Sequence, residues 1–82
     1  MSETFRVTDE TVTTRRRARA IAADARDVGA SEIDLAGVGF VSRSVADEFV
    51  HRASEYGIEL AGASGDVERM IEAVRDPKPV TA

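Results

Sequence analysis

The residues best placed for chemistry are two serines, Ser42 and Ser44, at the start of an expected helix. A short apolar stretch over 33–35 precedes them, and a turn containing Gly37 and Gly39 joins the two. Hydroxyls and unpaired backbone N–H groups gather at a helix N-terminus, where the helix dipole favours anions such as phosphate. We therefore expect this region to recognise another molecule, and we expect no enzymatic activity.

Ser44 has two interpretations that the sequence leaves open. As an N-cap, its hydroxyl would accept from the N–H of Asp47, whose carboxylate would reach back in a capping box. As a regulated site, it would carry a phosphate attracted by Arg43 but repelled by Asp47 and Glu48. Asp47 and Glu48 are adjacent and point about 100° apart on a helix, which disfavours a convergent acid–base pair. We read them as charges that complement the helix N-terminus or as partner contacts.

The turn over 37–39 comes near the glycine fingerprint of dinucleotide-binding domains. Ser42 stands where that fingerprint has its last glycine or alanine. The acid at the expected distance, Glu59, would lie inside a strand, whereas a ribose-binding acid belongs at a strand's end. The chain is also too short for the paired halves of such a domain. We read Gly37 and Gly39 as parts of a tight turn, with nucleotide or anion binding as the alternative, and expect no cofactor.

Four arginines crowd the start of the first expected helix: Arg15, Arg16, Arg17 and Arg19. Cations at this end oppose the helix dipole by about 0.3–1 kcal/mol each at low salt. We therefore expect a compensating partner, namely Asp9 and Glu10 just upstream, carboxylates of another chain, or a bound anion. Nucleic-acid binding by this cluster is disfavoured because no aromatic residues interleave and the net charge is −4.

The composition limits the classes of function. The chain has 82 residues, 43% hydrophobic and 32% charged, which is typical of one small globular domain. It has no cysteine and a single histidine, His51, which we place on the surface, so we expect no metal site. No apolar run suits a membrane helix or a signal peptide, and the expected location is cytoplasmic with no membrane partner. The acidic surplus with one lysine, Lys78, also fits a salt-rich habitat.

Short alternating stretches over 5–7, 33–35 and 58–60 predict three strands with one buried and one open face. The polar residues of these strands, which should share the open face, are Arg6, Asp34 and Glu59. Because sheets covered on both faces have continuously apolar strands, all helices should lie on one side. We predict a two-layer α/β sandwich with three to four mostly parallel strands. A second N-terminal strand at 12–13, forming a hairpin, is left open.

Apolar spacing predicts about three helices, over 13–28, 45–56 and 66–75. The inward residues of the first are expected to be Ala18, Ile21, Ala22, Ala25 and Val28. Those of the second are Val45, Phe49, Ala53 and Tyr56, with Ala46 and Val50 beside them. Those of the third are Val67, Met70, Ile71 and Val74. Gly29 and Gly57 should end the first two helices, Ser64 or Asp66 should cap the third, and Pro77 and Pro79 should stop it. We predict one domain over 1–76 and a flexible tail over 77–82.

The stretch 33–49 resembles STAS domains, the fold of bacterial anti-sigma factor antagonists. The matching residues are Ile33-Asp34-Leu35, Gly37-Val38 and Phe40, and Ser44 falls on the family's phosphorylated serine. Arg43 replaces the family's first serine, and Val45 and Asp47 replace its glycines. The chain is more similar to a smaller STAS-like family of unknown function, whose Ser-x-Ser-x-Ala-Asp-Glu character is kept in residues 42–48.

The resemblance implies a regulatory module that binds another protein through the segment Ser42–Phe49. Partners in the family include histidine-kinase-like ATPases and other regulators. Phosphorylation of Ser44, or with less support of Ser42, would control that binding, with Arg43, Asp47 and Glu48 on the same surface. The short sheet leaves unpaired edges, so a homodimer through an edge or the open face is also compatible with the sequence.

Overall fold

The computed structural model describes residues 3–75. Within this range the chain forms five short strands and three helices in the order ββαββαβα. Their bounds are β1 Thr4–Arg6, β2 Thr11–Val12, α1 Arg15–Asp27, β3 Glu32–Asp34, β4 Phe40–Val41, α2 Arg43–Tyr56, β5 Glu59–Ala61 and α3 Gly65–Arg75. The predicted tail over 77–82 lies outside the described residues.

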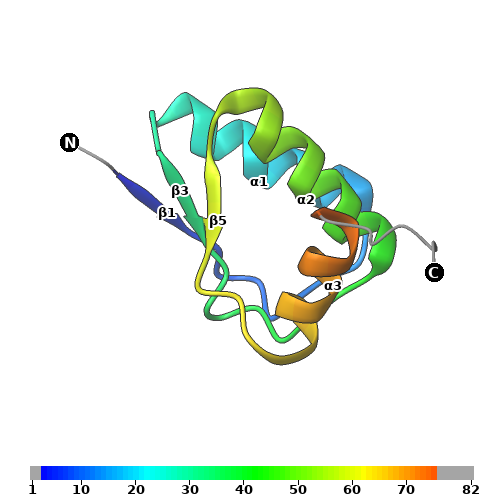
Figure 1. Cartoon of the computed structure of the whole chain (residues 1–82). Helices are drawn as coiled ribbons and strands as arrows, with labels where there is room; N and C mark the ends of the chain where they lie inside the picture. The colour runs from blue at the N-terminus through cyan, green and yellow to red at the C-terminus, as the bar shows by residue number, and fades with distance from the viewer. Residues whose placement is uncertain (1–2, 76–82) are drawn as a thin grey trace.

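The strands form two small parallel sheets, one in the order β1-β3-β5 and one that pairs β2 with β4. Figure 1 shows α1 and α2 on the same side of the three-stranded sheet, with α3 beside α2. Phe5, Ile33 and Leu60 are register partners in the middle of this sheet and pack in or against the hydrophobic core. The predicted two-layer α/β fold with mostly parallel strands is confirmed, although five strands form where three to four were expected, and they divide between two sheets.

The face of the sheet away from the helices carries the charged residues. Arg6 and Asp34 are register partners, and the Arg6 Nε lies 3.5 Å from the Asp34 Oδ2. Glu59 of β5 is the register partner of Glu32 of β3, two residues before Asp34. Because side chains alternate along a strand, all four share one face. The predicted open face is therefore correct.

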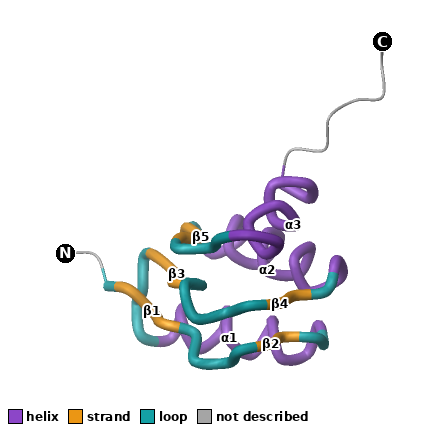
Figure 2. The backbone as a smooth tube through the Cα atoms, turned by 90° about the horizontal axis from the view of Figure 1, so that it is seen from below, coloured by secondary structure: helices purple, strands orange, loops and turns teal. Residues whose placement is uncertain are grey.

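The N-terminal hairpin that the sequence left open does not form. A second strand is present near the predicted position, but β2 pairs with β4 and not with β1 (Figure 2). The backbone N–H of Gly39 donates to the carbonyl of Glu10 at 2.7 Å and holds the two segments together just before this pairing. Sequence reasoning missed β4 because a strand of two residues has too few positions to show alternation.

Helix α1 buries four of its five predicted inward residues: Ala18, Ile21, Ala22 and Ala25. Val28 is the exception, being 54% exposed. The helix ends at Asp27, so Val28 is its C-cap and lies beyond the buried stripe. Gly29 follows with φ of +73°, the left-handed conformation predicted for the residue that ends this helix.

Helix α2 is the centre of the domain, since it packs against α1, α3 and β5. Phe49 is its largest fully buried side chain. Tyr56 is only half-buried, and the Arg26 guanidinium covers its ring at 4.9 Å from the centroid. Gly57 ends the helix with φ of +69°, as predicted.

Helix α3 buries Val67 and Ile71, while Met70 and Val74 are half-buried against the core. It begins at Gly65, directly after Ser64, one of the two residues predicted to start it. In residues 3–75 no helix combines the length and the apolar character needed to cross a membrane.

Candidate functional site

Helix α2 begins at Arg43, earlier than predicted, and its N-cap is Ser42. Ser42 has the extended backbone of an N-cap, with φ of −77° and ψ of 164°, and its Oγ accepts from the N–H of Val45 at 3.2 Å. The interpretation of Ser44 as N-cap, with Asp47 completing a capping box, is therefore wrong. The reason is local: the chain leaves β4 at Val41, so the first extended residue that can cap the helix is Ser42.

Ser44 instead lies inside the first turn of α2, half-buried, with its Oγ 3.2 Å from the Oγ of Ser42. The two hydroxyls form one hydrogen-bonded pair at the N-terminus of α2. A modification of either serine would therefore alter the surroundings of the other.

Replacing Ser42 by alanine should lower the free energy of unfolding by about 1 kcal/mol, because the N–H of Val45 loses its acceptor. Ser44→Ala removes a hydroxyl that caps nothing and should cost under about 0.5 kcal/mol. Urea denaturation of both variants checks the difference. A larger loss for Ser44→Ala than for Ser42→Ala would contradict the assignment of the cap.

Ser44 lines a hollow of about 510 Å³ between α1, α2 and α3. Arg15, Arg43 and Asp47 line the same hollow, together with Ala73 and Val74 of α3. The structure thus brings together both arginines and the hydroxyl that the sequence singled out, although Arg15 comes from a different helix.

A second hollow of about 310 Å³ adjoins the first through Ala73, and Phe40 and Met70 line it. Phe40 is 49% exposed and is, with Val28, one of the two large apolar side chains exposed in residues 3–75. We call the combined area the α2-start surface, defined by Phe40, Arg43, Ser44, Asp47, Met70 and Ala73. It is an apolar patch with a charged and hydroxyl-bearing border.

Glu48 is not on this surface. Its side chain is buried, the residue being 5% exposed, so the alternative that Glu48 contacts a partner is wrong. The carboxylate accepts from Arg52 at 2.7 Å, from Arg15 at 3.3 Å and from Arg19 at 3.4 Å. The hydrogen bond from Arg52, supported by the other two arginines, lowers the pKa of Glu48 although burial acts in the opposite direction.

The ion cluster of Glu48 joins α1 to α2, and sequence reasoning did not find it. One usable signal was the spacing of Glu48 and Arg52, because a glutamate four residues before an arginine favours an ion pair along a helix. The bonds from Arg15 and Arg19 depend on how the two helices pack, which no local pattern reveals.

The arginines at the start of α1 are largely paired within the domain. Arg17 donates two hydrogen bonds to Asp9, at 2.9 and 2.8 Å, and the pKa of Asp9 is lowered mainly by that pairing. Arg15 also lies 3.6 Å from Asp47. Of the four predicted cations, Arg16 alone shows no ion pair within residues 3–75. The expected compensation by Asp9 is confirmed, and few cations are left for nucleic acid or another anion.

The glycine turn offers little to a nucleotide phosphate. The N–H of Ala36 donates to Asp34 Oδ1 at 2.9 Å, that of Val38 to the Leu35 carbonyl at 3.0 Å, and that of Gly39 to Glu10. β4 then separates the turn from α2, so the expectation that the turn opens directly into the helix is wrong. A Cβ at Gly37 or Gly39 would lie 3.5 Å from the Val7 carbonyl or 3.7 Å from the Glu10 carbonyl, which are ordinary contact distances, so neither position requires glycine for space.

His51 is exposed on α2, as expected for a surface histidine. Within residues 3–75, no group of three histidine, aspartate or glutamate side chains is arranged to hold a metal ion.

Comparison of the chain with protein-family models, with curated proteins and with solved structures gave no match. The resemblance to STAS-like domains stays a prediction.

Proposed function

We propose that this chain is a small, non-enzymatic, cytoplasmic regulatory module of STAS-like type that binds another protein through the α2-start surface. Phosphorylation of Ser44, or secondarily of Ser42, would switch that binding. The supporting observation is that the Ser44 hydroxyl and two arginines line one hollow, directly beside an exposed aromatic side chain.

The apolar part of the surface suits a protein partner. Aromatic residues and arginines contribute most to the energy of protein interfaces, especially where a polar border surrounds them. Phe40 supplies the aromatic anchor, Met70 an adaptable neighbour, and Arg43 the charged border.

The polar part suits regulation by charge. A phosphate on Ser44 would add about −1.5 to −2 charges at neutral pH. It would attract Arg43 and draw Arg15 away from Asp47 and Glu48, to which Arg15 is now paired. It would also repel Asp47 of the same helix turn. Both effects change the charge of the surface, and none of the side chains involved belongs to the hydrophobic core.

A photo-crosslinking experiment tests the proposal. A photoreactive phenylalanine analogue in place of Phe40 should crosslink one defined protein in the cells of origin, because the ring would lie in the interface. The same analogue at Val28, an equally exposed apolar position at the end of α1, is the matched control and should not crosslink that protein. With Ser44→Asp in the Phe40 variant, the crosslinked fraction should fall at least fivefold, with the melting temperature nearly unchanged.

Equal crosslinking from positions 40 and 28 would contradict a partner site at the α2-start surface. Crosslinks to nucleic acid instead of protein would favour the alternative function assigned to the arginine cluster. A crosslinked partner that is insensitive to Ser44→Asp, Ser44→Glu and Ser42→Asp would leave the interface in place and refute the switch.

A further inference from the structure

The outer edge of β5 is an open sheet edge, because no strand of residues 3–75 pairs with it. The N–H of Glu59 donates to the Ser31 carbonyl at 2.9 Å, and the carbonyl of Ala61 accepts from Leu35 at 2.8 Å, so both residues bond toward β3. Backbone groups of successive residues alternate in direction along a strand. The N–H and C=O of Leu60 therefore point outward, where an added strand could pair with them.

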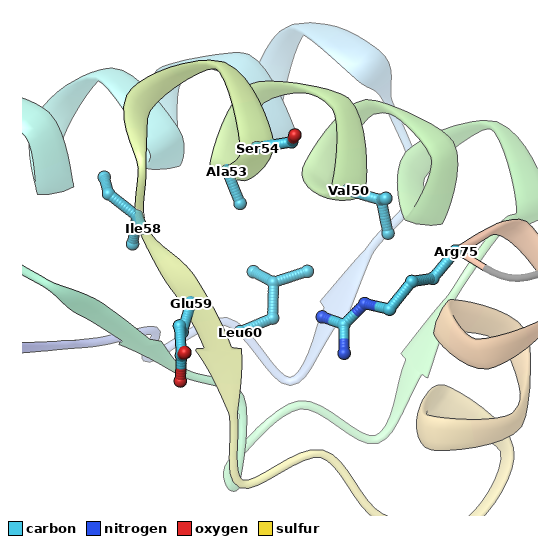
Figure 3. A pocket seen from close by; sticks show the side chains of 7 residues that line it. All are labelled: Val50, Ala53, Ser54, Ile58, Glu59, Leu60 and Arg75. Carbon is cyan, nitrogen blue, oxygen red and sulfur yellow. The ribbon is translucent and has the colours of Figure 1, made fainter.

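A hollow of about 420 Å³ lies against this edge. Its apolar wall consists of Val50 and Ala53 from α2 and Ile58 and Leu60 from the strand segment (Figure 3). Leu60 and Val50 are half-buried. The hollow continues along α3 into a smaller one of about 180 Å³ that shares Leu60 and Arg75 with it. Together they form a groove, the β5 groove, between the strand and α3.

One cation is directed into the β5 groove. Figure 3 shows the Arg75 side chain extending from α3 toward Leu60, whereas the Glu59 side chain lies on the other side of the strand. The Arg75 Nη1 is 3.9 Å from Glu72, the longest ion pair in residues 3–75. The guanidinium can therefore exchange this weak contact for a carboxylate within the groove.

We propose that the β5 groove binds an extended segment of a partner protein by strand addition. The segment pairs with the backbone of Leu60, inserts an apolar side chain between α2 and β5, and pairs an acidic side chain with Arg75. Because residues two apart in a strand share a face, the recognised pattern is an apolar and an acidic residue separated by one position. Backbone pairing supplies affinity, and the carboxylate supplies selection.

A single extended chain fits this groove better than a second folded copy. Residues of α3, including Ile71 and Glu72, line the groove opposite the strand, so the space beside β5 is bounded on both sides. The site is separate from the α2-start surface, since the two share no residue and lie on different sides of α3. The inference does not depend on the proposed function.

The test is an NMR titration of the full chain with the peptide acetyl-Thr-Val-Thr-Glu-Thr-Val-Thr-amide. This peptide presents the pattern in either direction. We expect saturable shifts of the amides of Leu60 and Ala61, with the amides around Phe40 and Ser44 unchanged. The peptide with glutamine in place of glutamate should bind about tenfold more weakly. Arg75→Gln should abolish this preference, whereas Arg16→Gln, a change at an exposed arginine on α1, should keep it.

Several results would overturn the proposal. Equal binding of the glutamate and glutamine peptides would show that Arg75 does not recognise an acidic side chain. Equal binding of a peptide methylated on every backbone nitrogen would exclude strand addition, because such a peptide cannot donate to the Leu60 carbonyl in either direction. Shifts at β1 in place of β5 would assign the binding to the other edge. Shifts of Leu60 that depend on protein concentration without peptide would identify a second copy as the occupant.

Discussion

Glu48→Gln is expected to lower the free energy of unfolding by about 2 kcal/mol, with a fall in Tm of roughly 10 °C. Glutamine keeps the shape of the side chain but leaves three arginines facing a neutral amide in a buried position. The loss should stay below that of a fully buried ion pair, because Arg15 and Arg19 are half exposed and can turn to water. Calorimetry or urea denaturation measures it.

The control for this variant is Glu55→Gln, which removes another carboxylate paired with Arg52. The Arg52–Glu55 contact is 3.0 Å long but exposed, so its loss should cost about 0.5 kcal/mol or less. Similar losses for the two variants would show that burial adds nothing to the Glu48 cluster.

The stability lost in Glu48→Gln should depend on pH. Since the folded state holds the pKa of Glu48 below its usual value of 4.5, this carboxylate stabilises the fold fully above that pH. The contribution is lost as the pH falls from 4.5 through the lowered folded-state pKa. The stability difference between the parent chain and Glu48→Gln should therefore shrink in this range. A difference that stays constant down to pH 3 would contradict the lowered pKa.

Gly62→Ala should destabilise the domain by about 3 kcal/mol. Gly62 has φ of +76°, which costs a residue with a side chain about 1–2 kcal/mol. A Cβ at this position would also collide with the Asp34 carboxylate and press on the backbone N–H of Ala36, and so break the hydrogen bond between them. Thermal denaturation checks the effect.

Gly57→Ala is the matched control for this second variant. Gly57 has a similar φ of +69° but open space around the missing side chain, so only the backbone cost of about 1 kcal/mol applies. Equal losses at positions 57 and 62 would show that the contact with Asp34 is unimportant for the fold.

The regular parts of the fold were predictable because their signals are local. The apolar stripe of α1 and the glycines that end α1 and α2 depend on neighbouring residues only. The alternation in β1, β3 and β5 correctly predicted which side chains lie on the open face of the sheet. The predicted ends of these strands differ from the observed ends by one residue. β4 and the position of the α2 cap were missed, because a strand of two residues shifts the helix start without any periodic signal.

The candidate site was predictable in its residue types but not in its geometry. Ser42, Ser44 and Arg43 were found from the turn and the helix start, yet which serine caps the helix depends on where β4 ends. The role of Glu48 and the approach of Arg15 to Ser44 arise from the packing of α1 on α2. The β5 groove requires α3 to lie beside the sheet, which is a tertiary property.

Because the helices cover only one side of the three-stranded sheet, its other face is free to contact a second copy of the chain in concentrated solution. On the bare sheet face the carboxylates of Glu32, Asp34 and Glu59 outnumber the single cation Arg6, so two molecules stacked through this face would repel each other. That repulsion weakens in concentrated brine, where the screening length falls to about 3 Å at 1 M ionic strength. The tendency to self-associate through this face should therefore rise with ionic strength.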